Sequence, residues 1–233
     1  MVERDLPSPR RSPNRRGEGE RLREEILASA CRLVSELGGA EALTIRGVAR
    51  TVGIAPASIY TQFADKSALV RGVIAHDYAR LTAALREADR AVAPEDVVAR
   101  ARAQVHAYCR FAVENPGHYR LMLGPPPAEE SVGGPDTASD TGSAARGEAR
   151  RNLLAEVVHQ FGRAFARCEQ AGIGLRMPAD RVGAMVFVSA HGRVALHHAD
   201  PADLDPEAVY PFVDELISAL LDPSELVARA PSV

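Results

Sequence analysis

Two short helix-forming segments between Thr44 and Phe63, joined by a glycine-containing turn at Gly53, constrain this fold most strongly. Thr44 is suited to cap a first helix that runs to about Thr51, and Pro56 suits the first turn of a second helix that ends near Phe63. Helices this short are not stable alone, so we expect them to share a small core with the helix that precedes them. The residues expected in that core are Ile45, Val48, Ala49, Val52, Ile54, Ile59 and Phe63.

The rest of the chain also follows helical periodicity. Residues from Leu22 to Leu37 form one apolar face, which Gly38-Gly39 ends, and Asp65 is suited to cap a long helix. Further helices are predicted from Pro94 to about Asn115, over 118–123, 147–171 and 178–198, and from Pro206 to about Asp222. Because no alternating strand pattern appears, the sequence predicts an all-α protein.

Composition divides the chain into regions. Residues 1–17 contain five arginines and three prolines, which indicates a flexible basic arm. Residues 18–71 form the first predicted domain and residues 72–223 the second, with a mobile Pro/Gly/Ser-rich loop at 124–147, a short connection at 201–206 and a tail at 224–233. Residues 1–71 carry 12 basic and 9 acidic residues, whereas residues 72–233 carry 16 and 22, so the basic front favours an anionic partner.

The uncharged stretch Val182–Gly192 has 11 residues, short of the roughly 18–20 that a membrane span needs. The N-terminus lacks the apolar stretch of a secretory signal, and the widely spaced cysteines Cys31, Cys109 and Cys168 fit buried thiols in a reducing compartment better than a redox sensor. We therefore expect a cytoplasmic protein that has no membrane partner.

The geometry expected for residues 44–63 is that of a helix-turn-helix, in which the start of the second helix enters the major groove. The segment resembles the DNA-binding domain of the TetR/AcrR family of bacterial transcription regulators, through Val52-Gly53-Ile54, Ile59-Tyr60-Thr61-Gln62-Phe63 and Lys66-Ser67-Ala68-Leu69. The resemblance covers Leu22 to Arg71 and implies a ligand-responsive regulator, most simply a repressor released from a palindromic operator by a small hydrophobic effector.

The resemblance places eight residues against double-stranded operator DNA, with Tyr60 and Lys66 as phosphate contacts: Thr44, Arg46, Pro56, Ala57, Ser58, Tyr60, Thr61 and Lys66. Gln62 stands where the family usually has His, and Ala55 stands where a capping Ser is usual, which costs about 1 kcal/mol. Since Ala57 and Ser58 are small, specificity is expected to depend on Arg46, on water or on DNA shape.

The C-terminal part resembles a TetR subgroup that has an Asn-Pro-x-x-Tyr-Arg-x-Met segment and a later Trp-His-Gly, here Asn115-Pro116-Gly117-His118-Tyr119 and Ala190-His191-Gly192. This resemblance implies a homodimer through the last two helices and an apolar ligand pocket within the domain. The expected interface residues are Val186, Val194, Val209, Phe212, Val213, Leu216, Ile217 and Leu220. The expected pocket residues are Tyr108, Phe111, Tyr119, Met122, Phe161, Phe165, Met185 and His191.

Several alternatives remain open at this stage. The helix pair could be a plain hairpin, the apolar helices could be buried within one monomer, and the chain could be a protein-interaction module that no longer binds DNA. A metal at His191, His197, His198 and Asp200 is disfavoured because neighbouring histidines on a helix point about 100° apart, so no metal or cofactor is expected. An enzyme using the C-terminal cavity is disfavoured because no GxSxG, HExxH, phosphate loop or dinucleotide fingerprint occurs.

Overall fold

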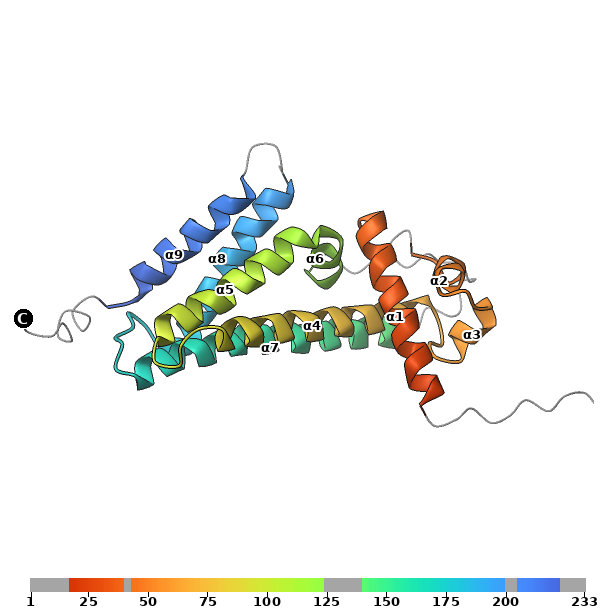
Figure 1. Cartoon of the computed structure of the whole chain (residues 1–233), viewed down its shortest axis with the longest axis horizontal. Coiled ribbons are helices and arrows are strands. Elements are labelled where there is room, and N and C mark those ends of the chain that lie inside the picture. The colour runs from red at the N-terminus through yellow and green to blue at the C-terminus, as the bar shows by residue number, and fades with distance from the viewer. Residues whose placement is uncertain (1–16, 40–42, 124–139, 200–204, 223–233) are drawn as a thin grey trace, which may run out of the picture.

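The computed structural model describes residues 17–39, 43–123, 140–199 and 205–222, which form helices and their connections (Figure 1). The helices are α1 (Glu18–Leu37), α2 (Ile45–Val52), α3 (Pro56–Tyr60), α4 (Lys66–Arg90), α5 (Val97–Glu114), α6 (Pro116–Leu123), α7 (Asp140–Gln170), α8 (Ala179–Ala199) and α9 (Val209–Leu220). Within these ranges, extended pairing is limited to one antiparallel bridge between Leu175 and Leu221. The predicted all-α class is confirmed.

The helix ends near the N-terminus lie where local residue chemistry predicts them. The Thr44 hydroxyl oxygen accepts a hydrogen bond from the Gly47 N–H at 3.0 Å, and the Asp65 carboxylate accepts one from the Ala68 N–H at 2.5 Å. At the other end of α2, Gly53 has φ 80°, a conformation that a side chain would strain. Both predicted N-caps and the glycine stop are therefore confirmed.

Three helix starts differ from the predictions. Pro94 does not open α5, because the Asp96 side chain caps it by accepting from the Ala99 N–H at 3.0 Å. Pro206 opens a 3-10 turn, and α9 begins only at Val209. Helix α7 begins at Asp140, so residues 140–147 are not part of the predicted mobile loop; acidic and hydroxyl residues that resemble a loop also favour helix starts. Residues 124–139, most of the predicted arm, part of the connection at 201–206 and the tail lie outside the described residues.

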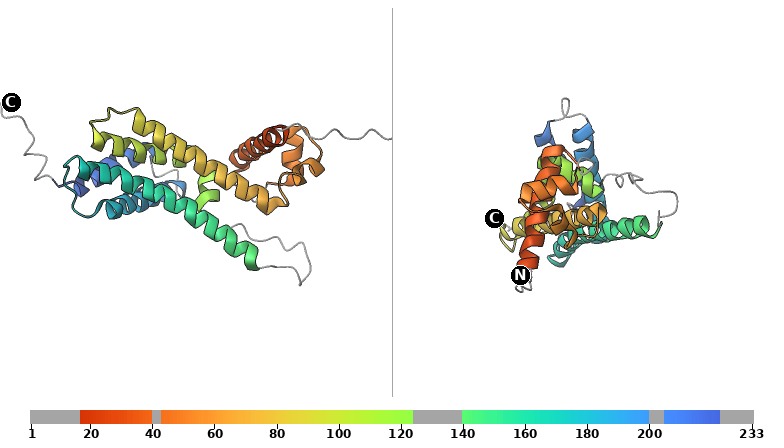
Figure 2. Two further views of the ribbon diagram at one scale, coloured as in Figure 1. Left: turned by 90° about the horizontal axis from the view of Figure 1, so that it is seen from below. Right: turned by 90° about the vertical axis from the view of Figure 1, so that its right-hand side faces the viewer.

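The side chains form two apolar clusters. The smaller one gathers α1, α2, α3 and the start of α4, with Ile26, Val34, Val48 and Ile59 fully buried. The larger one gathers α4 to α9 around Tyr108, Phe161 and Phe165. Helix α4 belongs to both clusters and runs from the small helical group into the large one, with α7 alongside it (Figure 2).

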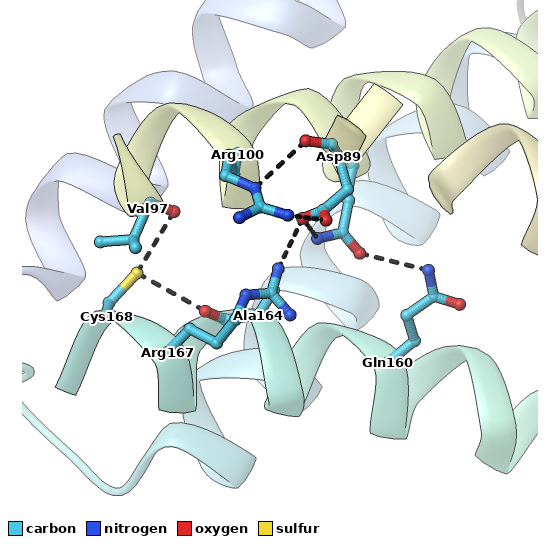
Figure 3. Close-up of polar contacts among 8 residues, drawn as sticks. Asp89, Val97, Arg100, Gln160, Ala164, Arg167 and Cys168 are labelled. Carbon is cyan, nitrogen blue, oxygen red and sulfur yellow. Dashed lines mark hydrogen bonds and ion pairs between the residues drawn. The ribbon is translucent and has the colours of Figure 1, made fainter. Parts of the chain in front are cut away.

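A polar junction fastens the end of α4 that is remote from α1–α3. Asp89 forms ion pairs with Arg100 of α5 and Arg167 of α7, the latter at 2.6 Å, and accepts a hydrogen bond from the Gln104 side chain at 2.8 Å (Figure 3). Gln160 of α7 in turn donates to Gln104 at 3.2 Å. Because these residues come from three helices, the junction fixes α4, α5 and α7 relative to one another.

Candidate nucleic-acid interface and effector cavity

The predicted DNA-facing residues lie around α2, α3 and the start of α4. Thr44, Arg46, Pro56, Ala57, Tyr60 and Thr61 are exposed, whereas Ser58 and Lys66 are half-buried. Tyr60 keeps 55% of its surface exposed although it adjoins the fully buried Ile59. The small cluster thus orients α3 with its first turn and Tyr60 directed outward.

The hydroxyl groups of Thr44 and Thr61 differ in whether they can donate a hydrogen bond to a phosphate. Thr44 Oγ1 accepts the capping bond from Gly47, which leaves its hydroxyl proton available for donation. Thr61 instead donates its hydroxyl proton to the Ser58 carbonyl at 2.7 Å. Phosphate oxygens accept hydrogen bonds, so Thr44 is the better phosphate donor in this conformation.

Arg23 contacts the end of the recognition segment, and the sequence did not predict this contact. Its guanidinium donates to the Gln62 carbonyl at 2.9 Å and lies 4.2 Å from the centre of the Phe63 ring. The contact joins residues 39 positions apart, so no local pattern signals it.

A buried polar cluster joins the small helical group to the large one. His118 of α6 lies with Nδ1 2.6 Å from the Asp77 carboxylate of α4 and with Nε2 2.8 Å from the Ser35 hydroxyl of α1. Asp77 and His118 are 0% and 1% exposed, and Asp77 also pairs with Arg80 at 3.5 Å. We call Ser35, Asp77 and His118 the interdomain cluster.

The order of these contacts is that of a serine-hydrolase triad, but neither cavity described below is lined by any of the three residues. Their side chains come from three different helices whose contact they fix. The cluster therefore has a structural explanation without catalysis.

Helix α6 also lies against the backbone at the end of α1. A Cβ placed on Gly117 would lie 2.6 Å from the Val34 carbonyl oxygen and 3.1 Å from the Gly38 carbonyl carbon, so only glycine fits without movement. Arg120 donates two hydrogen bonds to the Gly38 carbonyl, at 3.2 and 2.5 Å. One face of α6 is therefore packed closely against α1 and hydrogen-bonded to its end.

The opposite face of α6 contributes Tyr119 and Met122 to a small apolar cavity. It leaves about 10 Å³ for the centre of a water molecule, close to the minimum for one water. Four predicted pocket residues are in its lining, which is Tyr78, Leu81, Tyr108, Phe111, Ala112, Tyr119, Met122, Leu154, Val157 and Phe187. The sequence missed the other six, which helical periodicity does not separate from ordinary core.

The remaining predicted pocket residues lie in different surroundings. Phe161 packs against the rings of Tyr108 and Phe187, at centroid distances of 6.0 and 6.3 Å, and so supports the lining. Phe165 is buried in the large cluster without belonging to the lining. Met185 is 42% exposed, so its assignment to the pocket is wrong: it lies on the outer face of α8.

His191 joins the two tyrosines of the lining. Its Nδ1 lies 3.1 Å from the Tyr108 hydroxyl and 2.8 Å from the Tyr119 hydroxyl, and its ring stacks on Phe187. Burial lowers the pKa of His191 and raises the pKa of both tyrosines. All three groups are therefore held in their neutral forms at neutral pH.

The predicted dimer residues require a correction. Six of the eight are buried within the single chain, at 6% exposure or less: Val186, Val194, Val209, Val213, Ile217 and Leu220. Leu216 is half-buried, and Phe212 is 38% exposed. The buried side chains pack α8 and α9 onto their own domain, so they are not available to a partner in this arrangement.

A different set of side chains forms the outward apolar face, which we call the outer stripe. Met185, Val188 and Leu196 of α8 are 42%, 65% and 60% exposed, and Phe212 is 38% exposed on α9, the helix that packs against α8. On a 3.6-residue helix the α8 members fall within one face.

No group of three or more His, Cys, Asp or Glu side chains within the described residues is arranged to hold a metal ion. Among the helices described, none is long and apolar enough to cross a membrane.

The comparisons with known proteins agree with this architecture. The profile of "Bacterial regulatory proteins, tetR family" matches residues 26–73, and that of "Tetracyclin repressor-like, C-terminal domain" matches residues 101–220. The first match spans most of the small cluster, and the second includes α8 and every lining residue of the cavity except Tyr78 and Leu81 of α4. Family membership, rather than a missing motif, identifies the chain as a regulator and not an enzyme.

Solved structures show the same fold. The fatty acid degradation regulator FadR from Bacillus halodurans is 13% identical, with a TM-score of 0.64 over 84% of this chain and 93% of its own. A protein of unknown function from Rhodococcus sp. RHA1 is 27% identical, with a TM-score of 0.62 over 86% and 96%. SmeT, the repressor of the Stenotrophomonas maltophilia multidrug efflux pump SmeDEF, is 15% identical, with a TM-score of 0.62 over 86% and 90%. With both profiles matched and the helix-turn-helix in place, the chain belongs to the TetR family of DNA-binding transcriptional regulators.

Proposed function

We propose that this regulator is a repressor that binds a palindromic operator as a homodimer and is released by a small apolar effector. The observation that carries the proposal is α6, because one face of this helix lines the cavity while the other grips α1 beside the DNA-binding helices. An effector that enlarges the cavity must move Tyr119 and Met122, and the same helix then shifts His118 against Asp77.

The proposed DNA contacts are Thr44, Arg46, Pro56, Ala57, Ser58, Tyr60, Thr61 and Lys66. The exposure of six of the eight, all but Ser58 and Lys66, supports this assignment. Tyr60 and Thr44 are proposed to donate to phosphates, and Arg46 is the longest side chain available for base edges. Phosphate contacts of this kind position the protein, whereas the small Ala57 and Ser58 leave specificity to Arg46 and to DNA shape.

The proposed dimer uses the outer stripe of α8 and α9, which keeps Phe212 from the residues that the sequence suggested and replaces the buried ones. Large exposed apolar side chains on two packed helices are a typical feature of protein-protein interfaces. Two copies of the recognition helix must stand one DNA turn apart, about 34–36 Å, to read a palindrome.

The proposed effector is uncharged and apolar, with at most a small hydrogen-bonding group. The cavity lining contains no charged side chain, so a carboxylate or ammonium placed there would lose its hydration without a partner. Burial keeps His191 and the two tyrosines beside it neutral through their shifted pKa values, so these groups suit a neutral polar atom. The subgroup suggested by the Asn-Pro-x-x-Tyr-Arg segment is consistent with such a ligand domain.

Selection of genomic DNA fragments by the purified protein, followed by footprinting, tests the proposal. We expect a protected near-palindrome and loss of retention for Tyr60→Ala, with Tyr60→Phe separating the hydroxyl from the ring. Since Tyr60 is 55% exposed, circular dichroism melting should be unchanged and serves as the folding control. A folded protein that retains no fragment would favour an interaction module, whereas turnover of a bound molecule that depends on His191 would favour an enzyme.

A further inference from the structure

An open groove lies on the outer side of the α4–α5 pair. It has a volume of about 450 Å³, and four alanines, Ala84, Ala88, Ala91 and Ala107, contribute to its lining. The lining also includes Phe111, Asn115 and four charged side chains, two of each sign: Arg80, Glu87, Arg110 and Glu114. Small side chains between balanced charges suit a flat, largely apolar molecule with no strong net charge.

Phe111 belongs to the lining of this groove and also to the lining of the small inner cavity. It is the residue that the two linings share. Its side chain is half-buried, so it borders solvent on one side and the aromatic cavity on the other. The ring therefore lies between the wide groove and the small inner cavity.

Arg80 holds the outer side of the Phe111 ring. Its guanidinium carbon lies 5.7 Å from the ring centre, within the range of a cation–π contact. The same guanidinium lies 3.5 Å from Asp77, which belongs to the interdomain cluster. A rotation of Phe111 thus disturbs a side chain that also contacts the cluster joining α4 to α6.

We propose that Phe111 is the gate through which an uncharged apolar effector passes from the α4–α5 groove into the inner cavity. This inference rests on the effector cavity proposed above and adds its route of access. Because the inner cavity has room for about one water molecule, a ligand enters only as the ring rotates and the lining expands. Arg80 keeps the gate closed in the absence of ligand.

Stopped-flow binding of the uncharged fluorescent probe N-phenyl-1-naphthylamine to the full-length protein tests the gate. Phe111→Ala should raise both the association and the dissociation rate constants by about 10-fold, since a step that requires conformational change is removed. Phe111→Trp should slow association. Val157→Ala is the matched control, because Val157 lines the inner cavity and not the groove, so it enlarges the cavity without opening it.

The possible outcomes distinguish failure of the proposed gate from failure of the proposed effector cavity. Probe binding whose rates are the same in Phe111→Ala and Val157→Ala would overturn the gate and leave the effector cavity intact. Failure of the wild-type protein and of both alanine variants to bind the probe would overturn both. Binding to Phe111→Ala alone would support a gate that remains closed to this probe in the wild type.

Discussion

Gly117 is the position where one added methyl group should separate α6 from α1. In Gly117→Ala the new Cβ would lie 2.6 Å from the Val34 carbonyl oxygen, where ordinary contact begins at 3.4 Å. The backbone of α1 cannot rotate away as a side chain can, so α6 must withdraw by about 0.8 Å. The hydrogen bond between His118 and Ser35 of α1, at 2.8 Å, would then lengthen toward the limit of bonding.

The expected cost follows from these two effects. Overpacking a tight site costs about 1–3 kcal/mol, and weakening buried hydrogen bonds costs about 1–3 kcal/mol more. Together these costs are about 2–6 kcal/mol, which for a chain of this size lowers Tm by roughly 4–24 °C. Because the withdrawn α6 resembles the effector-bound arrangement in the proposed mechanism, operator affinity should fall by about 5–150-fold.

Thermal melting and fluorescence-anisotropy titration of the selected DNA measure both effects. Gly162→Ala is the matched control, since its added Cβ would lie 3.4 Å from the nearest atom, Asp180 Cα, at ordinary contact distance. The control should be neutral or stabilised by up to about 1 kcal/mol through helix propensity. Equal Tm values and equal DNA affinities for the two variants would refute the reasoning about α6.

Four further predictions concern charge, assembly and pH. Lys66→Ala should flatten the slope of log affinity against log salt by about 2 for the dimer, and an unchanged slope would remove Lys66 from the phosphate contacts. Val188→Asp should convert the dimer to monomers in sedimentation, because it places a carboxylate in the outer stripe; a dimer that persists would locate the interface elsewhere. Burial raises the pKa of Cys31 and Cys109 to about 12, so stability should be complete below pH 9 and fall as pH rises toward 12, and denaturation at fixed urea that shows no alkaline loss would contradict this. Burial lowers the pKa of His191, so stability should fall as pH drops below 6.5, and His191→Gln should reduce that dependence.

The parts of the fold that the sequence predicted correctly depend on local chemistry. Thr44 and Asp65 cap helices because a side-chain oxygen reaches an N–H three residues ahead, and Gly53 adopts a positive φ that other residues avoid. These contacts lie within a few residues, so the order of amino acids is sufficient to place the helix-turn-helix.

The predictions that failed concern which face of a helix is buried. Helix α8 is apolar on nearly every side, so periodicity did not separate Val186, which packs inward, from Val188, which is 65% exposed. The same ambiguity placed Met185 in the pocket. The contact of His118 with Asp77 joins residues 41 positions apart, and that with Ser35 joins residues 83 apart, so only the tertiary structure brings them together.

The Asp89 junction sets the point about which α4 can tilt. Since Asp89 holds one end of α4 to α5 and α7, any tilt of this helix must be largest at the opposite end, where Lys66 begins it beside the recognition segment. At 1.5 Å per residue, the arm between them is about 35 Å long, so a rotation of about 5° displaces the Lys66 end by about 3 Å. That displacement is close to the 3.4 Å rise of one base pair along a strand. A tilt of α4 that leaves the atoms around Asp89 almost in place is thus large enough to shift a recognition helix away from the base pairs of its half-site.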